Sequence, residues 1–212
     1  MTQTISRLFD SYSDATGAVH ALEGSGVSHD DISVIANNAD GTHAERAKDG
    51  IETRDGVNDD GDVTRGTLTG AALGGAGGLL AGLGLLAIPG LGPIVAAGWL
   101  AATAAGAGIG AIGGAATGGI VGALKNAGHS NEDAHVYSEG VRRGGTLVSV
   151  RAPEERRIEI EAILDDHAPV DAASRRQAYR ETGWTSFEAD APAFDTAQIE
   201  RERERQAQDS RI

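Results

Sequence analysis

The fold is decided by one long apolar stretch, residues 66–124, which reads GTLTGAALGGAGGLLAGLGLLAIPGLGPIVAAGWLAATAAGAGIGAIGGAATGGIVGAL. None of its 59 residues (124 − 66 + 1) is Asp, Glu, Lys, Arg or His, and the charged residues Arg65 and Lys125 bracket it. A charge-free surface of this size is too large for a small monomer to hide. The stretch therefore predicts a segment that packs in a lipid bilayer or in the shared core of an oligomer.

Glycines recur at every fourth position in both halves of this stretch. This small-xxx-small spacing lets the backbones of two helices approach closely. The two sets lie in register for an antiparallel hairpin centred near residue 94. In such a hairpin each glycine of one set faces a glycine of the other, because the residue numbers of every facing pair have the same sum. The predicted tip contains Pro89, Gly90, Gly92 and Pro93, which interrupt a helix. The predicted helix-packing residues are Gly66, Gly70, Gly74, Gly78, Gly82, Gly106, Gly110, Gly114, Gly118 and Gly122.

The length of the two predicted helices favours a bilayer. Residues 66–87 would span about 33 Å and residues 101–124 about 36 Å, against a hydrocarbon core of about 30 Å. Arg65 and Lys125 would then lie at the headgroups, and Trp99 would anchor the tip in the far interface. Ten glycines in helix interiors cost roughly 10 kcal/mol relative to alanine, so close packing in lipid or in an oligomer must offset that cost.

The segments on either side of the hairpin predict two halves of one small α+β domain. Residues 1–37 read as a strand, a helix capped by Asp14 and a second strand. Residues 38–65 are acidic and dotted with glycine, which is typical of a linker. Residues 125–173 predict a helix capped by Ser130 or Asn131, a strand over 146–150, a second helix, and a short edge strand over 168–172.

The last segment, residues 174–212, has the composition of a charged tail. Its three large aromatic residues, Trp184, Phe187 and Phe194, need a surface to cover them, so we expect them to dock on the domain or on a partner. A final helix over 198–206 is almost wholly Glu and Arg. Because such a helix has no apolar face, its pattern favours a solvated helix over a partner-binding one.

Composition argues against several classes of function. The 18 Lys and Arg residues against 31 Asp and Glu give a net charge of −13, which repels the phosphates of nucleic acid. The absence of cysteine removes thiolate catalysis and zinc–thiolate sites. The six histidines show no metal-ligand spacing, and no serine lies in a Gly-x-Ser-x-Gly elbow.

Two motifs resemble binding sites but lack the required context. Residues 108–113 match the dinucleotide fingerprint GxGxxG, yet no strand precedes them and the period of four explains their glycines. Residues 58–62, NDDGD, are acidic around a glycine but lack the ligand spacing of a calcium loop. We therefore predict no catalytic residue, no cofactor and no metal site.

Three stretches carry a family resemblance: DISVI at 31–35, LLAIPGLGP at 85–93 and YSEGVRRGGTLVSV at 137–150. Over roughly residues 3–173 the chain resembles the bacterial general-stress, or heat-induced stress, protein family. The resemblance implies a split ferredoxin-like sheet, with two strands before a glycine-zipper insert and two after it. It also implies a role in the stress response, with no known chemistry and no catalytic residues to transfer.

Together these patterns predict an α+β fold, a ferredoxin-like sandwich interrupted by a glycine-zipper helical hairpin and followed by a tail that is largely disordered or helical. The leading functional hypothesis is a non-enzymatic, stress-related homo-oligomer, anchored by the hairpin in the inner membrane with its globular part in the cytoplasm. Its expected partners are copies of itself and the lipid bilayer, not nucleic acid. The alternative is a cytoplasmic, self-assembling structural protein whose hairpins form the core of a ring or filament.

Overall fold

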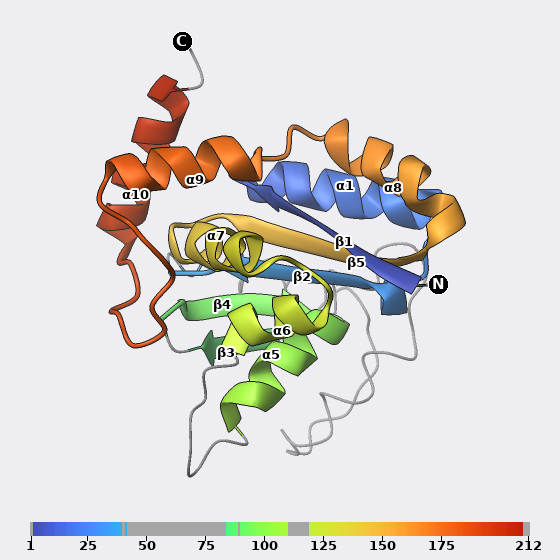
Figure 1. The fold of residues 1–212 in the computed structure, drawn as a ribbon, viewed down its shortest axis with the longest axis horizontal. Helices are drawn as coiled ribbons and strands as arrows, with labels where there is room; N and C mark the ends of the chain where they lie inside the picture. The colour runs from blue at the N-terminus through green and yellow to red at the C-terminus, as the bar shows by residue number, and fades with distance from the viewer. Residues whose placement is uncertain (1, 40, 42–83, 89, 110–118, 210–212) are drawn as a thin grey trace, which may run out of the picture.

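The structure of the protein, a computed structural model, describes residues 2–39, 41, 84–88, 90–109 and 119–209. It is an α+β fold in which a five-stranded sheet carries helices on both faces (Figure 1). The strands are β1 (Thr2–Phe9), β2 (Ile32–Asn37), β3 (Gly84–Ile88), β4 (Gly92–Ala97) and β5 (Thr146–Pro153). The helices are α1 (Tyr12–Gly24), α5 (Trp99–Ile109), α6 (Gly119–Asn126), α7 (Asn131–Arg142), α8 (Arg157–Asp165), α9 (Ala172–Glu181) and α10 (Thr196–Asp209), with short 3-10 turns η1 (His29–Asp31) and η3 (Glu154–Arg156).

The strands lie in the order β1-β5-β2-β4-β3, and every neighbouring pair is antiparallel. β5 therefore separates β1 from β2, with Val150 opposite both Ile5 and Ile32. On the other side of β1, Leu8 forms an isolated antiparallel bridge with Val170. This single bridge is all that the structure shows of the edge strand predicted over residues 168–172.

Each face of the sheet is covered by its own helices, because residues alternate along the strands. α1 and α8 cover one face, where Phe9, Leu22 and Ile160 belong to the core. α5, α6 and α7 cover the other face, where Leu8, Leu124 and Val141 belong to a second core. The sheet is thus buried on both sides.

The predicted tip of the helical hairpin is the turn of a β-hairpin. β3 pairs with β4 from Gly84 opposite Ala96 to Ile88 opposite Gly92, so the chain reverses at residue 90 and not near residue 94. Gly90 and Gly92 have φ values of 77° and 78°, a backbone conformation that glycine adopts without strain. Residues 84–97 were predicted to be the end of a helix and its tip. They form strands because β4 pairs with β2 and extends the sheet.

The second predicted helix, over 101–124, is also not one rod. α5 and α6 pack against each other (Figure 1), which two parts of one straight helix cannot do. Gly106 lies in α5 and Gly122 in α6. Residues 66–83 and 110–118, which hold Gly66, Gly70, Gly74, Gly78, Gly82, Gly110, Gly114 and Gly118, lie outside the described residues.

Within the described part of the chain, no helix combines the length and the hydrophobicity needed to cross a membrane. α5 has 11 residues and α6 has 8, which gives about 16 Å and 12 Å against a hydrocarbon core of about 30 Å. The predicted transmembrane hairpin and its location in the inner membrane are therefore wrong.

Candidate functional site: a buried ion-pair cluster under the C-terminal segment

A buried polar cluster lies where the end of α7 meets the C-terminal segment. Ser130 caps α7 by accepting a hydrogen bond from the backbone nitrogen of Asp133 at 3.0 Å. From there the helix places Glu139, Arg142 and Arg143 together, because residues three and four apart share one face. We call residues 182–195, which connect α9 to α10, the strap.

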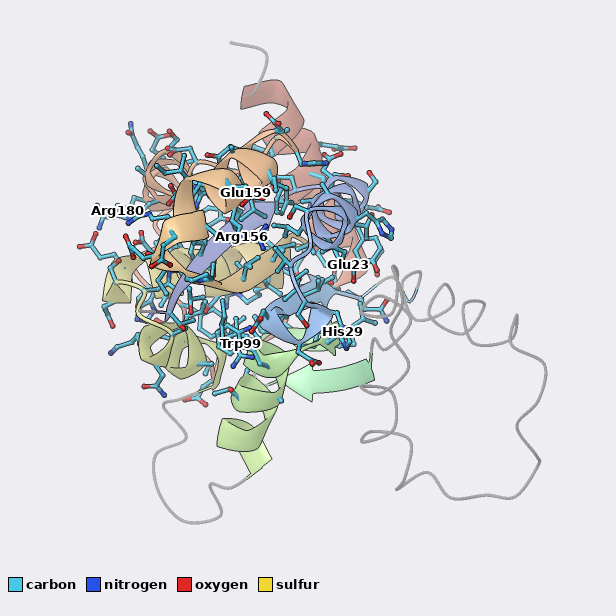
Figure 2. All side chains as sticks on the ribbon, turned by 90° about the vertical axis from the view of Figure 1, so that its right-hand side faces the viewer. Glu23, His29, Trp99, Arg156, Glu159 and Arg180 are labelled. Carbon is cyan, nitrogen blue, oxygen red and sulfur yellow. The ribbon has the colours of Figure 1, made fainter. Side chains whose placement is uncertain are left out.

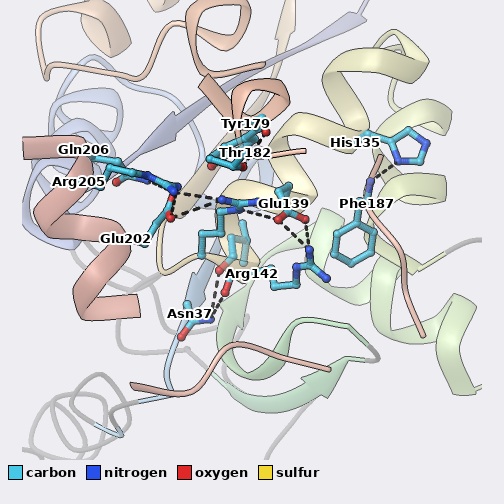
Figure 3. Close-up of polar contacts among 12 residues, drawn as sticks. Asn37, His135, Glu139, Arg142, Tyr179, Thr182, Phe187, Glu202, Arg205 and Gln206 are labelled. Atoms are coloured by element: carbon cyan, nitrogen blue, oxygen red, sulfur yellow. Dashed lines mark hydrogen bonds and ion pairs between the residues drawn. The ribbon is translucent and has the colours of Figure 1, made fainter. Parts of the chain in front are cut away.

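Glu139 is fully buried and pairs with Arg142, the last residue of α7 (Figure 3), and with Arg143, which follows it. Its carboxylate lies 2.7 Å from Nη2 of Arg142 and 2.6 Å from Nε of Arg143. Arg143 also reaches α10, where its Nη1 lies 3.4 Å from Oε1 of the buried Glu202. Glu202 in turn pairs with Arg205. The cluster thus ties α7 to α10 through an unbroken series of ion pairs.

Three guanidinium groups face two carboxylates in this cluster, so it carries one excess positive charge. Burial by itself would lower the pKa of Arg143, but the charges of Glu139 and Glu202 outweigh burial and raise it. A buried ion pair contributes little net stability when complete, whereas removal of one partner leaves an uncompensated charge. The arrangement therefore favours one docked position of α10 over others.

Aromatic rings of α9 and the strap cover the same arginines. The guanidinium of Arg143 lies 4.2 Å from the centre of the Tyr179 ring and 5.5 Å from that of Phe194. Arg142 lies 5.6 Å from the ring centre of Phe187 and 5.4 Å from that of Phe194. Such cation–π contacts are strongest where water is excluded.

The aromatic residues expected to need a surface find one on their own domain. Phe187 is buried in the core formed with α5, α6 and α7. Trp184 makes an edge contact with Tyr179, with ring centres 5.5 Å apart. The sequence pattern favoured a solvated final helix. The structure shows that α10 is only partly solvated, because Ile199 and Glu202 are both buried.

The predicted tip glycines form part of this site. A β-carbon on Gly90 would lie 2.8 Å from the carbonyl oxygen of Ala189, and one on Gly92 would lie 2.7 Å from Cβ of Ala193. The strap thus packs across the β3–β4 turn at Gly90 and Gly92, where the absence of a β-carbon leaves room for it. Pro93 follows in β4, where its carbonyl accepts a hydrogen bond from the backbone nitrogen of Asn38 at 3.0 Å.

A hollow of about 360 Å³ lies beside the cluster, between α9, α10 and the chain around residue 170. Four of its five charged groups are paired, since Arg175 binds both oxygens of Asp10 at 2.8 and 2.6 Å and Arg205 binds Glu202, while the fifth, Asp171, caps α9 by accepting from the backbone nitrogen of Ser174 at 2.8 Å. Tyr179 also lines it, and burial raises the pKa of this tyrosine to about 12. The hollow therefore presents two neutralised pairs and one carboxylate that is already used as a helix cap.

The residues predicted to lie at a membrane interface have other roles. Trp99 begins α5 (Figure 2), its Nε1 donates to the carbonyl of Asp31 at 3.3 Å, and the guanidinium of Arg151 lies 5.0 Å from its ring centre. It is partly buried against the core of its own domain. Lys125 is exposed in α6, and Arg65 lies outside the described residues.

A second buried polar group joins β1, β5 and the loop before α7. The hydroxyl of Ser6 lies 2.7 Å from that of Ser149 and 2.8 Å from Nε2 of His129. Burial lowers the pKa of His129, while Asp133 acts in the opposite direction. Both hydroxyls are at most 2% exposed, so a substrate would not reach them in this conformation. Among the described residues, no group of His, Asp and Glu is placed to hold a metal ion.

Comparison with protein-family models, curated proteins and solved structures finds no match for this chain. The site therefore has to be interpreted from its own geometry.

Proposed function

We propose that the protein is non-enzymatic, has a role in the stress response and acts by self-association, with two copies pairing along strand β3. The observation that carries this proposal is the position of β3 at the end of the sheet, where it pairs with β4 alone among the described strands. The stress-related part of the proposal rests on the resemblance of the sequence motifs.

An edge strand presents unpaired backbone donors and acceptors that another strand can bind. Natural proteins usually protect such an edge with charged residues, an interior proline or a bulge. β3 reads Gly-Leu-Leu-Ala-Ile and has no charge or proline within it, and its register with β4 runs without a bulge. Antiparallel pairing of two β3 strands would create a symmetric dimer with one continuous sheet.

The core of the domain also supports the ferredoxin-like arrangement as a proposal. In the sheet, β5 lies between β1 and β2, which α1 connects in the chain. After β5, α8 leads toward Val170, which bridges to the free side of β1. The resulting order, Val170-β1-β5-β2, is the order expected of a ferredoxin-like sheet interrupted between its second and third strands. In this interpretation the second and third strands are β2 and β5, and the segment inserted between them in the chain contains β3, β4, α5, α6 and α7.

Self-association is tested first by light scattering of the purified full-length protein. We expect a mass at least twice the 21.6 kDa of one chain, and we expect Leu86→Lys in the middle of β3 to reduce it to that of a monomer. The matched control is Ile158→Lys, because Ile158 of α8 is 82% exposed and lies far from this edge in the fold. A wild-type monomer at every concentration would rule the proposal out.

A cross-link keeps the test valid if Leu86→Lys fails to fold. The chain has no cysteine, so single substitutions Gly84→Cys, Leu85→Cys, Leu86→Cys, Ala87→Cys and Ile88→Cys report only on contacts between copies, and in a symmetric antiparallel pair the residue on the two-fold axis faces its own copy. Cα atoms of directly paired residues lie about 4.5–5.5 Å apart, which is within the range of a disulfide. At least one of these variants should form a disulfide-linked dimer while Ile158→Cys does not. The absence of a β3 cross-link in an oligomeric protein would place the interface elsewhere.

A further inference from the structure

One contact of the strap depends on the protonation state of a histidine. The backbone N–H of Phe187 donates to Nδ1 of His135 on α7 at 3.1 Å (Figure 3). Phe187 is 7% exposed, while His135 is half-buried and accessible to protons from solvent. The hydrogen bond thus connects the one buried aromatic residue of the strap to the helix beneath it.

The chemistry of imidazole fixes the sign of this dependence. Nδ1 accepts a hydrogen bond only when it carries no proton, and both ring nitrogens of a protonated histidine are donors. Protonation of His135 would therefore set an N–H against the N–H of Phe187. Histidine is the side chain whose ordinary titration falls between about pH 5 and pH 8. We propose that His135 is a pH-sensitive switch that holds the strap on α7 when neutral and loosens it when protonated.

The charged groups around His135 are already paired with one another. On α7, Glu132 and Asp133 bind Arg176, and Glu139 binds Arg142. The other charged residues on the elements packed against α7, and in the strap, are Arg7, Lys125, Arg151, Arg175, Arg180, Glu181, Glu188, Asp190 and Asp195.

Loosening at His135 would act on the strap and not on the whole tail. The strap crosses Gly90 and Gly92 at the β3–β4 turn just after Phe187. α10 has a separate attachment through Arg143 and Glu202, neither of which depends on His135. The switch would therefore free residues 184–195 while α10 stays docked. This inference does not depend on pairing through β3.

The test is amide hydrogen exchange, measured residue by residue on the full-length protein. After correction for intrinsic exchange, the protection factor of the Phe187 amide should fall about tenfold between about pH 8 and pH 5, the effect of losing one hydrogen bond. Amides of β5 provide the internal reference, and their protection should stay constant. If Phe187 and β5 lose protection together, the chain is unfolding as a whole and the proposal is wrong.

Three variants separate the switch from a general effect of acid. His135→Asn keeps an acceptor near the position of Nδ1 but does not titrate, so Phe187 should stay protected at both pH values. His135→Phe removes the acceptor, so the protection should be low at both. His129→Asn changes a second half-buried histidine, in the loop before α7, and should keep the wild-type pH dependence. A pH dependence that persists in His135→Asn, or is lost in His129→Asn, would overturn the proposal.

Discussion

The side chain of Ile199 occupies the space above Gly144, since a β-carbon on Gly144 would lie 2.5 Å from Cγ2 of Ile199. Gly144 follows the end of α7 and has a φ of 102°. We predict that Gly144→Ala displaces α10 and destabilises the fold by about 1–3 kcal/mol from overpacking, in addition to backbone strain. Urea unfolding measures the loss, and proteolysis of α10 reports its displacement.

Gly128→Ala is the control for Gly144→Ala. Gly128 has a φ of 99°, close to that of Gly144, but an added β-carbon there would have no neighbour within 4 Å. Both substitutions share the backbone strain, so the difference between them isolates the contact with Ile199. Equal losses of stability would show that α10 does not pack against Gly144.

Replacement of the buried carboxylate in the ion-pair cluster should be costly. Glu139→Gln keeps the shape of the side chain but leaves Arg142 and Arg143 without their shared counter-charge, and we expect a loss of about 3 kcal/mol. The control is Glu159→Gln, which breaks the exposed pair with Arg156 at 2.8 Å (Figure 2). Exposed pairs contribute little, so urea unfolding should detect no change in that variant. Similar midpoints for both variants would contradict the role assigned to Glu139.

Alkaline pH should destabilise the protein through Tyr179. Burial raises the pKa of this tyrosine to about 12, against the opposing effects of Arg175 and Arg143, whereas a tyrosine in an unfolded chain titrates near pH 10. The folded state thus favours the protonated hydroxyl. The protonated hydroxyl therefore contributes roughly 2–3 kcal/mol to the free energy of unfolding. This contribution is complete below about pH 10 and is lost as the pH rises toward 12.

Tyr179→Phe removes this titration and keeps the ring against Arg143 and Trp184. Unfolding free energies measured from about pH 9 to pH 11.5 should therefore fall less steeply in Tyr179→Phe than in the wild type. Tyr137→Phe is a useful comparison, because burial also raises the pKa of Tyr137. A slope unchanged by Tyr179→Phe would mean that the hydroxyl is not buried as described.

Local patterns in the sequence were sufficient for the elements that form from local interactions. β1, β2 and β5 lie where alternation and β-branched residues predicted strands, and Ser130 caps α7 as one of two predicted candidates. At α1 the cap is Ser11, which accepts a hydrogen bond from the backbone nitrogen of the predicted cap Asp14. These features depend on residues only a few positions apart.

The β3–β4 hairpin could not be predicted in the same way. Its residues are apolar and rich in Gly, Leu and Ala, a composition that fits a helix in lipid as well as a strand in a sheet. What decides between the two is pairing with β2, from Val34 opposite Ala97 to Asn37 opposite Ile94. That partner lies more than fifty residues away. Gly90 and Gly92 of the predicted tip do lie at the reversal of the chain, but the predicted centre near residue 94 and the predicted helical structure of residues 84–87 were wrong.

The candidate site was missed because its partners are far apart in sequence. Glu139, Arg142 and Arg143 have the spacing of a helical ion-pair group, a signal that could have been used. Nothing in the sequence indicated that Glu202, 59 residues beyond Arg143, would join them. In α10 the local sign of burial is Ile199, the one large apolar residue in a helix that otherwise consists of Glu, Arg, Gln, Ala, Thr and Asp.

The central position of β5 also governs the order of events during synthesis. Asn37 ends β2 and Thr146 begins β5, and the two residues are 109 positions apart (146 − 37). At about 5–20 residues per second, a ribosome needs roughly 5–20 s to cover that distance. During that interval β1 and β2 have emerged without the strand that joins them, and contacts between distant residues form slowly. The nascent chain therefore exposes β1 and one edge of β2 for seconds, since β4 can pair only with the other edge of β2, and this is the period in which a chaperone would protect it from aggregation.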